Sequence, residues 1–129
     1  MNKKHFETLK PSFNGIDKSL LLAMPYEYKG RDIEVLAETD EFTCLCPWSG
    51  LPDFARVAVK YTPDKSVVEL KSLKFYLQSF RMTGIVHESA VNRILEDVSK
   101  CVRPRSMSVE MVFNLRGGIK TTVRAEYKK

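Results

Sequence analysis

The sequence predicts a single α+β domain in which one antiparallel four-stranded sheet carries two helices on one face. Its length of 129 residues suits one domain, and 43% apolar with 29% charged residues is a globular mixture. Apolar residues alternate in the first and last parts of the chain, and helical spacing appears between them. The order strand, strand, helix, helix, strand, strand disfavours parallel β-α-β winding.

Residues 1–30 show little periodicity and contain Pro11, Gly15, Pro25 and Gly30. Such residues interrupt regular structure. We therefore expect an extended or turning arm at 1–30 that packs on a folded unit at 32–129, the two making one domain.

The first two strands are predicted at Asp32–Glu38 and Phe54–Tyr61. In each, apolar side chains alternate with charged or bulky ones, as on a half-buried strand. The alternating residues are Ile33, Val35 and Ala37, then Ala55, Val57, Val59 and Tyr61. Thr62–Lys65 is a turn by composition, and a short strand is expected at Ser66–Leu70.

Two helices are predicted next, over Lys71–Phe80 and from about Val91 to Val102. The first has apolar residues at helical spacing, as does the second: Leu73, Tyr76, Leu77 and Phe80, then Val91, Ile94, Leu95, Val98, Cys101 and Val102. Gly84 separates the helices and Pro104 ends the second. Cys101 is thus most simply a core residue.

The last quarter predicts a hairpin. Two alternating runs flank the turn Arg116-Gly117-Gly118. The first run is Met107, Val109, Met111, Phe113 and Leu115, and the second is Ile119, Thr121, Val123 and Ala125.

The segment Phe42–Phe54 reads as a loop that is rich in reactive residues. Three cysteines without a secretion signal favour reduced thiols. Cys44 is interpreted as a buried packing residue. The Cys44-x-Cys46 pair could alternatively bind zinc, but the chain has only His5 and His87 as imidazoles, and we expect no metal.

The chain is expected to act in the cytoplasm, away from membranes. No run approaches ~20 apolar residues, and the start at Met1 lacks the pattern of a signal peptide. The net charge of +5 could suit nucleic acid, an anionic membrane or a phosphorylated small molecule. Because the basic residues are dispersed, direct nucleic-acid binding is not expected.

The run Glu69-Leu-Lys-Ser-Leu-Lys-Phe-Tyr76 resembles the signature of the short, single-domain NADPH-dependent 7-cyano-7-deazaguanine reductases. Phe75 stands where that signature has Leu or Tyr, and the position stays apolar. The resemblance extends from about Phe42 to Gly118, because Leu-Cys-Pro, Pro-Asp-Phe, the signature, His-Glu and Arg-Gly-Gly occur in the family's order.

The resemblance implies a tunnelling fold, whose ββααββ units close into rings that stack face to face, with active sites between subunits. It implies reduction of 7-cyano-7-deazaguanine (preQ0) to the aminomethyl base (preQ1) in tRNA queuosine biosynthesis, through a covalent thioimide. By the same resemblance Cys46 is the nucleophile and Asp53 the proton donor. The substrate-binding residues it implies are Val68, Glu69, Leu70, His87 and Glu88.

NADPH as cofactor rests on the resemblance alone. The chain has no glycine-rich dinucleotide loop after a strand that would support it independently. Lys71, Lys74 and Arg116 are candidates for its phosphates. Lys71 and Lys74 could equally form a solvated helix face.

Other interpretations stay open at this point. Without the family, Glu69 and Glu88 are ordinary charges at the ends of elements, and His87 could cap a helix. A zinc cyclohydrolase of the same fold is the strongest enzymatic alternative. A basic RNA-binding module is an alternative of another class, although no aromatic RNA-binding motif is present.

Overall fold

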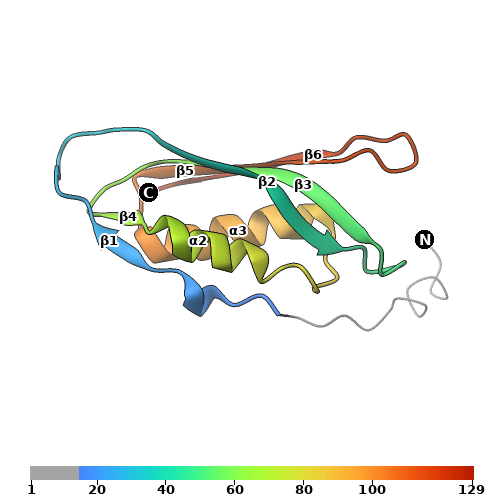
Figure 1. Cartoon of the computed structure of the whole chain (residues 1–129). Helices are drawn as coiled ribbons and strands as arrows, with labels where there is room; N and C mark the ends of the chain where they lie inside the picture. Colours follow the sequence, from blue (N-terminus) through green and yellow to red (C-terminus); the bar gives the residue numbers. More distant parts are fainter. Residues whose placement is uncertain (1–14) are drawn as a thin grey trace.

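A four-stranded antiparallel sheet, in the order β2-β3-β5-β6, is the centre of the computed structural model, which describes residues 15–129. Its strands are β2 (Val35–Leu45), β3 (Pro52–Thr62), β5 (Ser106–Phe113) and β6 (Thr122–Lys128). Helices α2 (Leu70–Gln78) and α3 (His87–Val102) lie on the same face of this sheet (Figure 1). The predicted fold class, an antiparallel sheet with a helix pair on one face, is confirmed.

A second, two-stranded sheet ties the described part of the arm to the domain. It pairs β1 (Ala23–Pro25) with β4 (Ser66–Val68), and a short 3-10 helix, η1 (Lys18–Leu20), precedes it. Residues of the arm run along the side of α2 away from the sheet (Figure 1). Leu22 N donates to Ser72 Oγ at 3.0 Å, and Gly15 N donates to Thr83 Oγ1 at 3.0 Å. The rest of the predicted arm, residues 1–14 with Pro11 and His5, lies outside the described residues.

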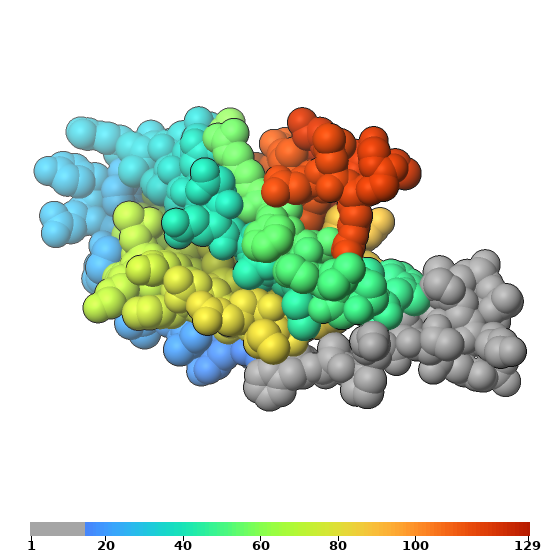
Figure 2. Space-filling model, turned by 45° about the vertical axis from the view of Figure 1, so that its right-hand side comes forward, coloured from blue at the N-terminus to red at the C-terminus, as the bar shows by residue number. Residues whose placement is uncertain are grey.

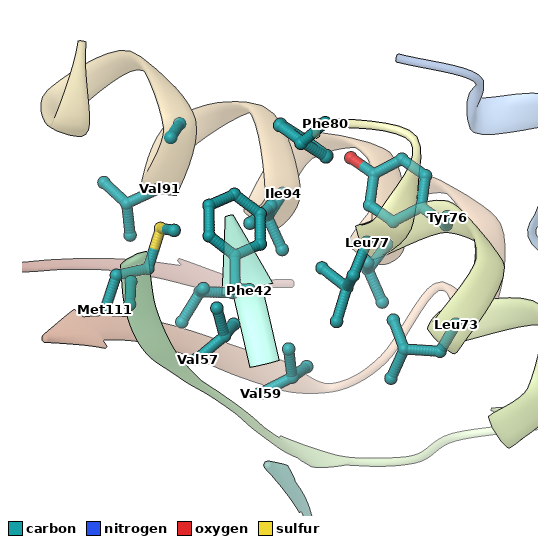
Figure 3. Packing of buried hydrophobic residues seen from close by; sticks show 14 of the residues in the cluster. Phe42, Val57, Val59, Leu73, Tyr76, Leu77, Phe80, Val91, Ile94 and Met111 are labelled. Carbon is teal, nitrogen blue, oxygen red and sulfur yellow. The ribbon is translucent and has the colours of Figure 1, made fainter. Parts of the chain in front are cut away.

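The core lies between the sheet and the two helices. Each helix presents its predicted apolar face, and the sheet contributes the inward residues of β2, β3 and β5 (Figure 3). Phe42 contacts Phe80 with ring centroids 5.3 Å apart. Burying one such side chain stabilises a fold by roughly 1.5–3 kcal/mol, so this layer holds both helices on the sheet.

A buried polar link also joins α2 to α3. Tyr76 Oη donates to Asp97 Oδ2 at 2.6 Å, and Arg93 Nε donates to the same oxygen at 2.7 Å. Burial and the neighbouring carboxylate raise the pKa of Tyr76. The three groups satisfy each other in a site where an unpaired polar group would be costly.

The first strand is longer than predicted, and a β-bulge explains the difference. Strand β2 runs on to Leu45, with a register shift between Thr39 and Phe42. An extra residue reverses which side chains face inward, so odd-numbered residues point to the core before the shift and even-numbered ones, Phe42 and Cys44, after it. The prediction of a loop over all of Phe42–Phe54 was therefore wrong, since only 46–51 lie outside strands. Ile33, predicted inward, is exposed and precedes the strand.

Several predicted boundaries also need correction. The short strand ends at Val68, because Glu69 caps α2 by accepting from Ser72 N, and α2 ends at Gln78, before Phe80. Helix α3 begins at His87, so His87 and Glu88 lie in its first turn and not before it. Leu115 and Ile119, predicted as strand residues, are exposed in the hairpin connection. Cys101 is only partly buried.

None of the helices within residues 15–129 is long and apolar enough to cross a bilayer.

Candidate active site

Three connections meet at one end of the sheet: the β2–β3 loop, the start of α3 and the β5–β6 turn. The β2–β3 loop carries Cys46 and is closed by backbone hydrogen bonds. Cys46 N donates to Leu51 O at 2.8 Å, and Gly50 N donates to Cys46 O at 2.8 Å. Gly50 has a φ of 72°, a conformation that glycine adopts without strain. The backbone around the thiol is therefore fixed.

The segment before α3 is fastened to the same loop. Leu45 N donates to Thr83 O at 2.9 Å, and Ile85 N donates to Leu45 O at 3.0 Å. These bonds form a short bridge beside the end of β2, with Leu45 opposite Gly84. As a result, the first turn of α3 begins close to the Cys46 loop.

Asp53 is the buried carboxylate of this end, with 8% of its surface exposed. It stands opposite Cys44 in the β2–β3 register, so its side chain points to the helix side of the sheet. Its Oδ2 lies 3.2 Å from His87 Nε2, and its Oδ1 forms an ion pair with Arg116 Nη1. The His87 ring stacks on Phe113, with centroids 3.5 Å apart and planes 4° apart.

The two cysteines of the Cys-x-Cys pair have different environments. Burial raises the pKa of Cys46, but hydrogen bonds from the Ser49 hydroxyl and from the backbone of Ser49 and Trp48 lower it below the ordinary thiol value, and Arg116 also lowers it. Burial, with Asp53 and Cys46 nearby, raises the pKa of Cys44 to about 12. Cys46 is therefore the better nucleophile, because the thiolate is the reactive form.

Arg116 reaches this centre from the β5–β6 turn. Its Nη1 pairs with Asp53, and its Nη2 lies 3.5 Å from Ser49 Oγ. Figure 2 shows the end of the hairpin, in orange, beside the green part of the chain that carries the β2–β3 loop. The structure thus brings Cys46, Asp53, His87 and Arg116 to one place.

The predicted strand-end residues lie elsewhere within one chain. Val68, Glu69 and Leu70 stand at the start of α2, while the segment that contacts the Cys46 loop follows its end. Nine helical residues separate the two ends by about 14 Å. Val68 is buried, Glu69 caps the helix, and Leu70 is 65% exposed.

Three other predicted residues carry charges that form no ion pair among residues 15–129. Glu88 is exposed in the first turn of α3, and among residues 15–129 its carboxylate has no hydrogen-bond or ion-pair partner. Lys71 and Lys74 are exposed on α2, and each Nζ lies 5.9 Å from the centre of the Phe75 ring. Two ammonium groups beside an exposed aromatic ring form a surface that suits phosphates and a stacked base.

Within the described part of the chain, no three His, Cys, Asp or Glu side chains gather as metal ligands. The sequence did not single out two residues of the centre, Ser49 and Phe113. Ser49 gave a weak signal, since it lies in the reactive segment. Phe113 gave none, because its alternation in β5 indicated only a core residue.

Comparisons with known proteins agree on one family. A model of the family described as QueF-like protein matches residues 52–129. The NADPH-dependent 7-cyano-7-deazaguanine reductase of Caldicellulosiruptor bescii is 49% identical over 91% of this chain and 89% of its own length. The reductase of the same name from Thermoanaerobacter pseudethanolicus is 43% identical over 98% of this chain and 94% of its own length.

A solved structure shares the fold. The archaeosine synthase QueF-Like in the apo form is similar with a TM-score of 0.65 and 26% identity, covering 74% of this chain and 91% of that chain. That protein is named as a synthase and not as a reductase, so the fold by itself does not choose between the two activities.

Proposed function

We propose, because the chain belongs to the QueF-like protein family, that it is an NADPH-dependent oxidoreductase. It reduces the nitrile of 7-cyano-7-deazaguanine (preQ0) to the aminomethyl base preQ1. This reaction is a step of tRNA queuosine biosynthesis. Its relatives at 43–51% identity carry that reductase name. The observation that carries the proposal is the Cys46 thiol of lowered pKa in a loop that Arg116 links to the buried Asp53.

In the proposed reaction, Cys46 attacks the nitrile carbon. A nitrile resists direct hydride transfer in water, whereas a thioimide accepts hydride more readily. The new S–C bond forms as one C–N π bond breaks, and the nitrogen takes a proton. A thiol with a lowered pKa supplies more thiolate for this attack at neutral pH.

Asp53 is proposed to transfer that proton. It can take the proton of the Cys46 thiol and pass it to the nitrile nitrogen, so that the sum of the step is addition of S–H across C≡N. His87 and Arg116 hold its two oxygens and so fix its direction. General acid catalysis of this kind typically contributes ~10²–10⁴ in rate.

NADPH, when bound, supplies the two hydrides that convert the nitrile to an amine. After the first, the adduct expels the Cys46 thiolate and leaves an imine, which the pocket must shield from water until the second. Lys71 and Lys74 are proposed to hold the phosphates beside the Phe75 ring. Arg116 was also predicted to bind phosphate, but its guanidinium is already bonded to Asp53.

Glu88 and His87 are proposed to hold the deazaguanine, since one carboxylate can accept from both the ring N–H and the exocyclic amine. Val68, Glu69 and Leu70 are proposed to complete the pocket from a neighbouring subunit, because within one chain they stand at the opposite end of α2 from the segment that contacts the Cys46 loop. Strands β2 and β6 are the open edges of the sheet. In a ring of copies side by side, β2 of one subunit can pair with β6 of the next, so that the backbone groups of both edges are hydrogen-bonded. Two such rings stacked face to face are the proposed assembly.

We propose that the enzyme acts in the cytoplasm on the free base, without direct nucleic-acid contact. The dispersed basic residues support this. Gel-shift binding of tRNA would contradict it.

The proposed function is tested by the absorbance of NADPH at ~340 nm. Adding preQ0 should oxidise two NADPH for each substrate consumed, and guanine, which has no nitrile, should oxidise none. Conversion of substrate without NADPH oxidation would instead indicate a synthase-like activity. A stoichiometric zinc ion in the purified protein would favour a cyclohydrolase.

A shared site predicts complementation between two inactive variants. Cys46→Ala lacks the nucleophile, and Leu70→Asp alters the exposed residue at the other end of α2. If each site takes Cys46 from one subunit and Leu70 from the next, an equimolar mixture, unfolded and reassembled together, should regain roughly a quarter of wild-type activity. Reassembled wild type is the control. A mixture as inactive as its parts, with wild type recovered, would mean that Cys46 and Leu70 serve each site from the same subunit, and would contradict the shared site.

A further inference from the structure

We propose that Arg116 is the positioning residue of both reacting groups, holding the Asp53 carboxylate and the Cys46 loop in place before any cofactor binds. The inference rests on the proposed function for its chemistry, but its geometry belongs to the chain itself. It assigns Arg116 to formation of the thioimide and not primarily to the phosphates of NADPH.

One guanidinium joins two elements that carry the chemistry. Arg116 Nη1 pairs with Asp53 Oδ1, while Nη2 lies 3.5 Å from Ser49 Oγ in the Cys46 loop. Ser49 in turn lowers the pKa of the Cys46 thiol through its hydroxyl and its backbone. The planar, always charged fork of arginine suits such a two-sided contact better than a lysine.

The backbone that carries Arg116 is held in a tight turn. Arg116 N donates to Ile119 O at 3.0 Å, and Ile119 N donates to Arg116 O at 3.0 Å. The two residues between them, Gly117 and Gly118, have φ of 58° and 79°, as a type I′ turn requires. Glycine takes both angles without strain, so the Gly-Gly pair lets the hairpin close directly after Arg116.

Asp53 depends on Arg116 more than its burial alone suggests. Within residues 15–129, the only partner of its other oxygen is His87 Nε2, at 3.2 Å. A buried carboxylate that loses one partner turns toward the remaining donor or draws in water. Removing Arg116 should therefore misdirect the proton donor and loosen the loop that holds the thiol.

The first test measures the reactivity of the Cys46 thiol as a function of pH, without substrate or cofactor. Among residues 15–129, Cys44 and Arg116 are the titratable or charged groups that act on the Cys46 thiol. Asp53 is bound to Arg116, and His87 lies behind Asp53. In Arg116→Gln, the rate of Cys46 alkylation by iodoacetamide should show its midpoint at higher pH than in wild type, because a positive charge that favours the thiolate is gone. Arg116→Lys should recover part of the shift.

Arg124→Gln is the matched control, since Arg124 lies in the same hairpin and pairs with Glu126 on its surface. Its alkylation profile should equal that of wild type. Thermal unfolding by circular dichroism should show that all three variants fold. An Arg116→Gln profile that coincides with wild type would overturn the proposal, whether or not the protein reduces preQ0.

The second test isolates the chemistry from the cofactor. With preQ0 and no NADPH, Arg116→Gln should form the Cys46 adduct ~10- to ~100-fold more slowly than wild type, because small misplacements of reacting groups cost this much. A raised KM for NADPH with an unchanged adduct rate would contradict the proposal and return Arg116 to the phosphates. If wild type formed no adduct and oxidised no NADPH, the proposed function would fail, and alkylation alone would decide the role of Arg116.

Discussion

Incubation with preQ0 in the absence of NADPH should add the mass of one substrate to each subunit, as a thioimide on Cys46. Cys46 is the cysteine whose environment lowers its thiol pKa, and it lies in a loop whose backbone is fixed by two short hydrogen bonds. Intact-protein mass spectrometry measures the adduct, and peptide mapping locates it. We expect Cys46→Ala to form no adduct and to lose turnover by at least ~10⁴-fold while still folding.

The chain supplies matched controls for this prediction. Cys44→Ala should leave both adduct and turnover, since burial raises the pKa of Cys44 to about 12 and its thiol stays protonated. Cys101→Ala should do the same, because burial raises the pKa of that thiol on the far part of α3. Asp53→Asn should slow adduct formation, since the nitrile nitrogen then receives no proton from this position. An adduct mapped to Cys44 or Cys101, or normal turnover in Cys46→Ala, would overturn the mechanism.

Periodicity alone predicted most of the fold. The two helices and the final hairpin were found because their apolar faces repeat at 3.6 and 2 residues, and packing against one sheet requires both patterns. The bulge in β2 was missed because it breaks the alternation that reveals a strand. Asp40 and Glu41 stand where an apolar residue would have extended the pattern, and the alternation resumes at Phe42 with opposite parity.

Strand β1 in the arm could not be predicted from local sequence periodicity. Strand β1 is three residues long, all exposed, and it pairs with β4 across more than forty residues of chain. A strand this short has no period of its own. It exists because it pairs with β4 and because Leu22, the residue before it, donates to Ser72 Oγ, and neither contact can be predicted from the local sequence.

The candidate site was predicted by resemblance, whereas its internal links came from the structure. Cys46 and Asp53 are close in sequence, but His87 and Arg116 lie 34 and 63 residues from Asp53. The contacts of Asp53 with both depend on the bridge between Leu45 and Gly84 and on the β3–β5 register, which are tertiary features. Ser49 and Phe113 became visible only through those contacts.

Glu88 is expected to carry much of the affinity for the deazaguanine. It is exposed on the first turn of α3, next to His87, and among the described residues nothing competes for its carboxylate. A hydrogen bond to a charged group contributes roughly 1.5–3 kcal/mol. Losing one such bond should weaken binding by at least ~10-fold, and losing both by ~100-fold or more.

Calorimetric titration of preQ0 into the Cys46→Ala protein measures this affinity without the covalent step. In that background, Glu88→Ala should show the full loss, and Glu88→Gln an intermediate one, since its amide keeps one acceptor of similar shape. Glu96→Ala is the control, because Glu96 is an exposed carboxylate of the same helix that pairs with Lys100. A loss of affinity equal in Glu88→Ala and Glu96→Ala would point to the net charge of α3 and not to a contact. An unchanged dissociation constant in Glu88→Ala would remove Glu88 from the site and leave the purine edge to be recognised by the strand-end residues of the neighbouring subunit.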